Sequence, residues 1–139
     1  MSRSGYSDSC EGWELIRWRG QVKSAIRGKR GQSLLREMLE ALDAMPQKRL
    51  IANALEKDGE VCALGSLGRK RGIDMTGIDP HEYETVAAKF GVARQLVQEI
   101  AYLNDECTWR QTPEERWKEM RDWVQQQLES GKVNSSREN

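Results

Sequence analysis

Apolar side chains recur every three or four positions along most of this chain, which is the spacing of amphipathic helices. The first apolar stripe falls between residues 11 and 27 and comprises Leu15, Trp18, Val22, Ala25 and Ile26. The next helix has a stripe that comprises Leu34, Leu35, Met38, Leu39 and Leu42. Gly28 and Gly31 bracket Lys29 and Arg30, so we expect a turn between these two helices.

The middle of the chain predicts two weaker helices. Pro46 is expected to end the second helix and to occupy the first turn of a third, where its missing N–H costs nothing. The inner face of that third helix would consist of Leu50, Ile51, Ala54 and Leu55. Five glycines lie between Gly59 and Gly77, so we expect a short helix there, followed by a loop.

Two helix-start signals mark the second half. Asp79 precedes Pro80 and is followed three positions later by Glu82, and Thr112 stands in the same relation to Pro113 and Glu115. A capping residue, a proline at the first helical position and a Glu at the third are typical of a helix N-terminus. We expect helices after each signal, with a break at Gly91 and a further helix after it.

These elements predict an all-α protein, a compact bundle of six or seven short helices. A chain of 139 residues is one domain's worth. We expect a flexible arm over residues 1–10, a single helical domain over 11–129 and a disordered polar tail over 130–139.

Residues 86–100 have the spacing of a helix-turn-helix hairpin. Small Ala87 permits a close helix contact, and Gly91 lies four positions later at the turn. In DNA-binding proteins the second helix of this motif enters the major groove. The side chains that would read bases are Arg94, Gln95 and Gln98. The same spacing also suits plain packing of two helices, and Arg94 is the one cation on the second helix.

Charge adds a second candidate site. The chain holds 22 Lys and Arg against 22 Asp and Glu, yet no acid lies between residues 17 and 36. That stretch contains seven cations: Arg17, Arg19, Lys23, Arg27, Lys29, Arg30 and Arg36. Such a run attracts phosphates or an acidic protein surface. Alternatively, it is a solvated face whose charges are neutralised in the folded protein by Glu14, Glu37 and Glu40.

The cations lie beside the apolar stripe of the first helix, so their stems can follow its edge while their charges stay in water. A partner would then contact a set of six residues, in which Trp18 supplies an apolar anchor. These are Trp18, Arg19, Lys23, Arg27, Lys29 and Arg30.

The sequence contains few residues that could catalyse a reaction or bind a metal ion. The chain has one histidine, His81, and three separated cysteines without a CxxC pair, so we expect no metal site, no cofactor and no enzymatic activity. An enzyme would need a cleft around His81 or Cys62, and we expect Cys62 to be buried. No signal peptide and no membrane span is evident, so we expect a cytoplasmic protein.

Four segments together resemble a family of small uncharacterised proteins that are encoded in tailed-phage and prophage genomes of Gram-negative bacteria. They are GWELIRWRGQVKSAIRGKRGQ, RLIANALEKDGEVCALGSLGRKRGIDM, IDPHEYETVAAKFGVARQLVQEIAYLNDE and TPEERWKEMRDWV. The resemblance covers about residues 10–128. It implies an accessory phage protein in the host cytoplasm and supplies no active site.

The sequence therefore predicts a non-catalytic phage accessory protein that binds an acidic partner through its basic helical face. The partner would be a host or phage protein, a defence protein among them, or a nucleic acid. The alternative is a helix-turn-helix transcriptional regulator, and a small enzyme with an unrecognised site is the third hypothesis. The sequence does not indicate the oligomeric state.

Overall fold

The computed structural model describes the backbone of residues 13–107 and 111–138, so the predicted arm of residues 1–10 lies outside it. Within these ranges the elements are α1 (Trp13–Arg27), α2 (Lys29–Ala44), β1 (Glu56–Lys57), β2 (Glu60–Val61), α3 (Ala63–Arg71), α4 (Tyr83–Phe90), α5 (Arg94–Tyr102), a π-helical turn η1 (Leu103–Cys107) and α6 (Pro113–Glu138). The all-α prediction is confirmed, with one two-stranded hairpin added. No helix among the described residues is both long and apolar enough to cross a membrane.

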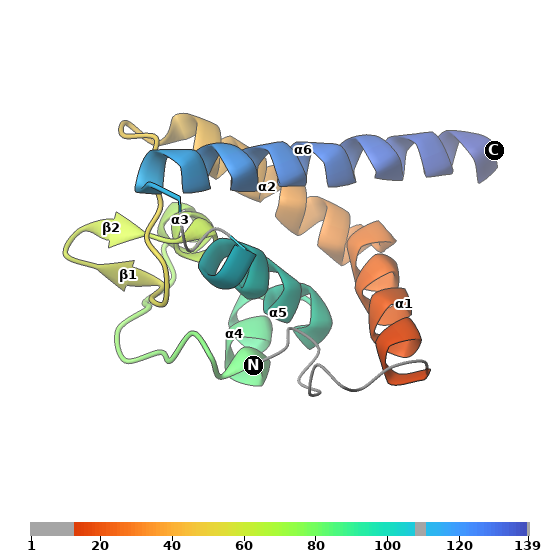
Figure 1. The fold of residues 1–139 in the computed structure, drawn as a ribbon, viewed down its shortest axis with the longest axis horizontal. Coiled ribbons are helices and arrows are strands. Elements are labelled where there is room, and N and C mark those ends of the chain that lie inside the picture. Colours follow the sequence, from red (N-terminus) through yellow and green to blue (C-terminus); the bar gives the residue numbers. More distant parts are fainter. Residues whose placement is uncertain (1–12, 108–110, 139) are drawn as a thin grey trace.

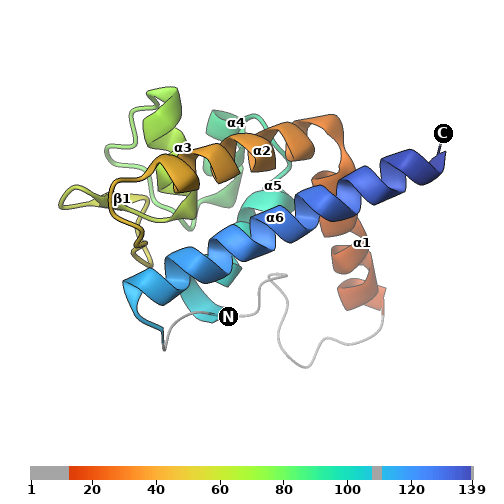
Figure 2. The same ribbon diagram turned by 90° about the horizontal axis from the view of Figure 1, so that it is seen from above.

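Helix α5 lies at the centre of the bundle and packs against α1, α3 and α4, while the long α6 lies along α2 (Figure 1, Figure 2). The apolar stripes of these helices meet in one core. Its largest fully buried side chains include Leu34, Leu35, Met38, Leu42, Leu67, Leu96, Ile100 and Met120. The stripes that the sequence predicts for the second helix and for the helix after Gly91 therefore do face the core.

The connection between α1 and α2 is tighter than the sequence predicts. Only Gly28 separates the two helices, and Gly31 is buried in the first turn of α2. A Cβ atom on Gly31 would lie 1.8 Å from the Ala25 carbonyl oxygen, so the helices can cross here only because residue 31 has no side chain. The Gln32 side chain closes the corner by donating to the Ile26 carbonyl oxygen at 2.8 Å.

The third helix, predicted to start at Pro46, is absent, because the backbone of residues 45–55 bonds to other parts of the chain. The Leu50 N–H donates to the Pro113 carbonyl at 3.0 Å, and the Ile51 N–H donates to the Val61 carbonyl at 2.9 Å. Leu50 and Leu55 are nevertheless buried, as their apolar character predicts. Tertiary hydrogen bonds have replaced the helical ones, which satisfies the backbone equally well.

A tight hairpin follows this irregular segment. Glu56 pairs with Val61 and Lys57 with Glu60 in antiparallel register. The two turn residues, Asp58 and Gly59, have positive φ values of 54° and 82°. An Asp-Gly pair with both φ values positive suits a two-residue hairpin turn whose twist matches that of the strands.

The short helix α3 agrees with the prediction for the glycine-rich centre. It begins after Cys62, whose sulfur accepts a hydrogen bond from the Gly65 N–H at 3.3 Å. It ends at Gly72, which has a left-handed φ of 72°. Gly65 is needed for packing, because a Cβ there would lie 1.9 Å from the Leu55 carbonyl oxygen.

The two predicted start signals behave differently. Thr112 and Glu115 form the reciprocal capping box, with Thr112 Oγ1 accepting from the Glu115 N–H at 3.1 Å and Glu115 Oε1 accepting from the Thr112 N–H at 3.2 Å. Asp79, in contrast, is not the N-cap. Its side chain accepts from the His81 N–H in a turn, and α4 begins later, at Tyr83.

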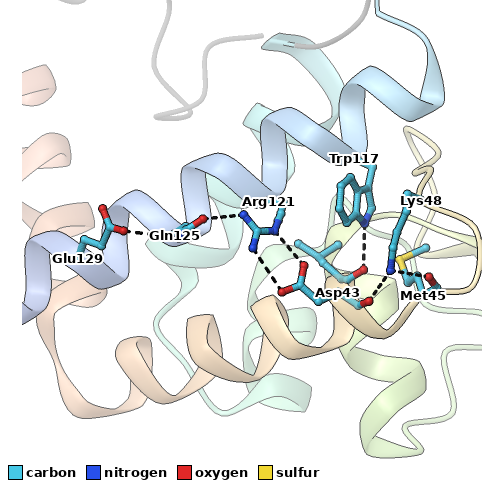
Figure 3. Close-up of polar contacts among 8 residues, drawn as sticks. Asp43, Met45, Lys48, Trp117, Arg121, Gln125 and Glu129 are labelled. Atoms are coloured by element: carbon cyan, nitrogen blue, oxygen red, sulfur yellow. Dashed lines mark hydrogen bonds and ion pairs between the residues drawn. The ribbon is translucent and has the colours of Figure 1, made fainter.

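The contact between α2 and α6 combines apolar and polar groups (Figure 3). The Trp117 indole N–H donates to the Leu42 carbonyl at 3.0 Å, where α2 is about to end. Arg121 pairs with Asp43 at 2.8 Å, and Lys48 lies over the Trp117 ring. Helix α6 then continues to Glu138, whereas the sequence predicts a helical domain that ends at residue 129 and a disordered tail after it.

The Asn104 side chain, which is buried, joins three parts of the chain. Its Oδ1 accepts from the Ala63 N–H at the start of α3, at 3.2 Å, and its Nδ2 donates to the Ile51 carbonyl at 2.9 Å. The Asn104 carbonyl accepts from Arg116 Nε at 3.0 Å, and Arg116 Nη1 also donates to the Leu50 carbonyl at 3.0 Å. These bonds hold the irregular segment against α3, η1 and α6.

Gly31→Ala and Gly20→Ala are expected to change stability in opposite directions. The methyl group that Gly31→Ala adds would overlap the Ala25 carbonyl, so this substitution should lower the free energy of unfolding by about 1–3 kcal/mol. The Gly20 methyl would meet nothing within 4 Å and should raise it by roughly 0.5–1 kcal/mol through helix propensity. Urea unfolding followed by circular dichroism measures both, and equal effects would contradict the close crossing of α1 and α2.

Asn104→Ala is expected to lower the free energy of unfolding by about 2–4 kcal/mol, because two buried backbone groups, Ala63 N–H and Ile51 C=O, lose their partner. The exposed Gln126 on α6 supplies the matched control, and Gln126→Ala should change stability by less than about 0.5 kcal/mol. Similar urea midpoints for the two variants would show that Asn104 does not hold the irregular segment.

Candidate functional site

The cations of the N-terminal stretch form an exposed surface on α1 and the start of α2. We call it the basic face and define it as Arg17, Arg19, Lys23, Arg27, Lys29 and Arg30, all of which are exposed. Arg19, Lys23 and Arg27 follow one another at four-residue intervals, so they line one side of α1. Beside them, each one position earlier in the chain, the buried side chains Trp18, Val22 and Ile26 face the core.

The acids that would have neutralised this surface are engaged elsewhere. Glu37 pairs with Arg71, and Glu40 pairs with Lys70 at 2.9 Å. The hydrogen bond from the Lys70 ammonium also lowers the pKa of the Glu40 carboxyl. Glu37 and Glu40 are therefore paired with cations of α3, and the side chain of Glu14 lies outside the described part of the chain.

Five cations of the basic face remain without an ion pair among the described residues. They are Arg17, Arg19, Lys23, Lys29 and Arg30, whereas Arg27 has a non-covalent partner of its own. The ion pairs within the described ranges draw their Lys and Arg from other segments: Arg49, Arg69, Lys70, Arg71, Lys118 and Arg121. The cations are thus exposed, as the solvated-face hypothesis predicts. Two of the three acids that this hypothesis expects to neutralise them, Glu37 and Glu40, pair with other cations instead.

Trp18 is not an exposed anchor, and this prediction is wrong. Its side chain is 3% exposed and belongs to the core, because it lies in the middle of the apolar stripe of α1. The apolar side chain that the surface does present is Ile16, which is 64% exposed. Ile16 precedes Arg19 by three positions and Lys23 by seven, so it lies on the same side of α1 as these cations.

The surface around Ile16 is open. Gly20 follows Ile16 by four positions, and a Cβ atom on Gly20 would meet nothing within 4 Å. The glycine therefore serves no packing contact inside the molecule. A partner can approach the backbone of α1 closely at this position, next to an exposed isoleucine and two cations.

The helix-turn-helix-like hairpin is present in α4 and α5, but α5 does not present its predicted reading residues. Gly91 makes the turn with φ 70°, as predicted, and Arg94 is exposed. Gln98 is only 4% exposed, so the prediction that it is available to bases is wrong. Gln95 is half-buried and donates to Gln21 of α1 at 3.4 Å. Helix α1 packs against α5, so part of α5 is engaged inside the molecule.

The residues considered for catalysis do not form a reactive group. Burial raises the pKa of the Cys62 thiol to about 12, and its sulfur already caps α3. His81 is exposed, and its Nδ1 lies 3.4 Å from an Asp79 carboxylate oxygen. Among the described residues, no group of three His, Cys, Asp or Glu side chains has the geometry to hold a metal ion.

Two of the hollows on the surface of the described residues lie near the hairpin and near α4. One has a volume of about 260 Å³ and lies between the end of α2 and the hairpin, where Arg49 pairs with Glu60 at 2.5 Å. The other has a volume of about 370 Å³ and lies where the start of α4 approaches that of α5. The second hollow is lined by His81, Glu82, Tyr83, Glu84, Thr85 and Arg94.

In a variant that retains Cys62 as its single cysteine, iodoacetamide at about pH 8 should alkylate the folded protein far more slowly than the urea-unfolded chain. A pKa of about 12, against 9.0 for an ordinary thiol, leaves about a thousandfold less thiolate. Mass spectrometry after timed quenching measures both rates. Rapid modification of the folded protein would contradict the burial of this thiol.

No family model, curated protein or solved structure matches this chain.

Proposed function

We propose that this protein is a non-catalytic accessory protein of a phage or prophage, which acts in the host cytoplasm by binding an acidic surface of another protein. The basic face would make the electrostatic contacts, and Ile16 would supply an apolar contact at the N-terminal end of this face. The proposal concerns a host protein, including one of a defence system, or another phage protein.

One observation carries this proposal. In a chain with as many acids as cations, the nearest described acids on α2 pair with α3 and leave Arg19, Lys23, Lys29 and Arg30 without carboxylate partners. Cations of this kind increase the rate of encounter with an acidic surface and select against basic ones. Arginines add bidentate contacts to carboxylates.

The position of Ile16 favours a protein partner over a nucleic acid. An exposed isoleucine among cations offers apolar area that a phosphate backbone does not match, whereas protein interfaces combine an apolar centre with a polar rim. The burial of Gln98 also removes a contact on which sequence-specific DNA reading by α5 would depend. The phosphates of a nucleic acid would also attract the basic face, without sequence specificity, and would compete with an acidic protein for it.

Substitution of three cations of the basic face, as Arg19→Gln, Lys23→Gln and Arg30→Gln, is expected to weaken partner capture on the order of tenfold. The bait is the tagged full-length protein, the source is a nuclease-treated lysate of infected cells, and quantitative mass spectrometry measures the recovered proteins. The matched control removes three exposed cations elsewhere, Lys57, Lys89 and Lys118, by the same change to Gln.

Gly20→Trp tests the same surface without changing charge. The added ring projects from an open position of α1, so the circular dichroism spectrum should match that of the parent protein and the thermal midpoint should be no lower. Capture should nevertheless be lost, because the ring blocks close approach to Ile16. Unchanged capture by both the charge variant and Gly20→Trp would overturn the proposal.

A gel shift with duplex DNA at physiological salt tests the alternative function, which is DNA reading through α5. A sequence-specific shift that Arg94→Ala abolishes, and that the Gln substitutions in the basic face leave intact, would replace the proposed function by DNA reading through α5. We expect no specific shift, because Gln98 is buried and Gln95 contacts Gln21 of α1.

A further inference from the structure

The chain contains an acidic counterpart of its own basic run. No Lys or Arg lies between Arg71 and Lys89, and that stretch holds four acids: Asp74, Asp79, Glu82 and Glu84. All four are exposed, and we call them the acidic segment. Among the described residues, the one ion pair that they make is that of Asp79 with His81.

The acidic segment borders a hollow. Glu82 and Glu84 contribute to the lining of the cavity of about 370 Å³ at the start of α4, together with the half-buried Tyr83 ring. Arg94 is the one Lys or Arg in this lining. The lining therefore combines an aromatic side chain with two carboxylates, which suits an aliphatic side chain that is flanked by cations.

Ile16 has these flanking groups, with Arg19 and Lys23 on the same side of α1. The match includes both components of an interface, because an exposed apolar side chain faces a partly aromatic hollow and two cations face two carboxylates. Arg19 and Lys23 make no ion pair among the described residues, and neither do Glu82 and Glu84, so each pair can supply counter-charges to the other.

The two faces cannot meet inside one molecule. Gln21 contacts Gln95 at the start of α5, next to the hollow, and it follows Ile16 by five positions, about 140° around the helix. Ile16 and its cations therefore project from the other side of α1. Helix α5 lies between α4 and α1 in both views of the ribbon (Figure 1, Figure 2).

We infer that the basic face of one copy of this protein docks on the acidic segment of a second copy, with Ile16 in the hollow and with Arg19 and Lys23 against Glu82 and Glu84. This inference rests on the proposed role of the basic face as a protein-binding surface, and it names a second copy of this chain as one occupant. Because two different faces meet, the contact is head-to-tail and extends into a ring or a chain of copies.

Self-association of the full-length protein, measured by analytical ultracentrifugation, is expected to increase with concentration in about 50 mM salt and to disappear in about 500 mM salt, which screens exposed charges. Variant A carries Arg19→Glu and Lys23→Glu, and variant B carries Glu82→Lys and Glu84→Lys. The association constant of each variant alone should be at least tenfold lower than that of the parent protein, because like charges then face each other across the contact.

An equimolar mixture of variants A and B should associate again. The reversed face of A is acidic and matches the reversed, basic segment of B, while the unchanged faces of both also match. A protein that carries Lys57→Glu and Lys118→Glu has the same charge change as variant A at unrelated positions and should associate like the parent. Ile16→Ser should weaken association without changing charge.

The inference is overturned if the parent protein is monomeric in low salt over the accessible concentrations. It is also overturned if variant A abolishes association but variant B does not, or if the mixture fails to associate. None of these results would affect the capture experiment with foreign proteins, so a failed self-association leaves the proposed function to be judged on its own data.

Discussion

The arrangement of the bundle depends on the polar contacts of Asn104 and Arg116 in its interior. The Asn104 side chain satisfies the start of α3 and the Ile51 carbonyl, and Arg116 connects η1 to the Leu50 carbonyl. An irregular segment can pass through an apolar core only if its backbone groups are bonded. These two side chains provide that bonding, and they also place the start of α6 beside η1.

The sequence predicts most of the helices because their apolar positions recur with a helical period, and it fails at residues 45–55 for an equally physical reason. Leu50, Ile51, Ala54 and Leu55 have helical spacing, yet their neighbours are set by bonds to Pro113, Val61 and Asn104. Periodicity records which side chains prefer burial. It does not record which backbone groups will find partners far away in the chain.

The candidate site was predictable as a charged stretch but not in its details. Exposure of the six cations could be expected from their position beside the apolar stripe, whereas the role of Trp18 could not, because a tryptophan suits both a core and an interface. Ile16 lies away from the stripe of Trp18 and Val22, and that offset was the available signal for an exposed apolar residue. Burial of Gln98 depends on the packing of other helices around α5, which no local pattern encodes.

The unbalanced charge of the basic face follows from how the core is assembled. Packing of α2 against α3 brings Glu37 and Glu40 to Arg71 and Lys70, which engages the acids that follow the basic run in the sequence. The close crossing at Gly31 then holds α1 and α2 as one corner, so the cations of both helices share a surface. A neutral chain acquires a positive face in this way because folding pairs its charges unevenly. Helix α1 exposes Arg19 and Lys23 and also packs against α5, in which Gln98 is buried, so the same helix carries the surface of the proposed protein contact and contacts the helix that was predicted to read DNA.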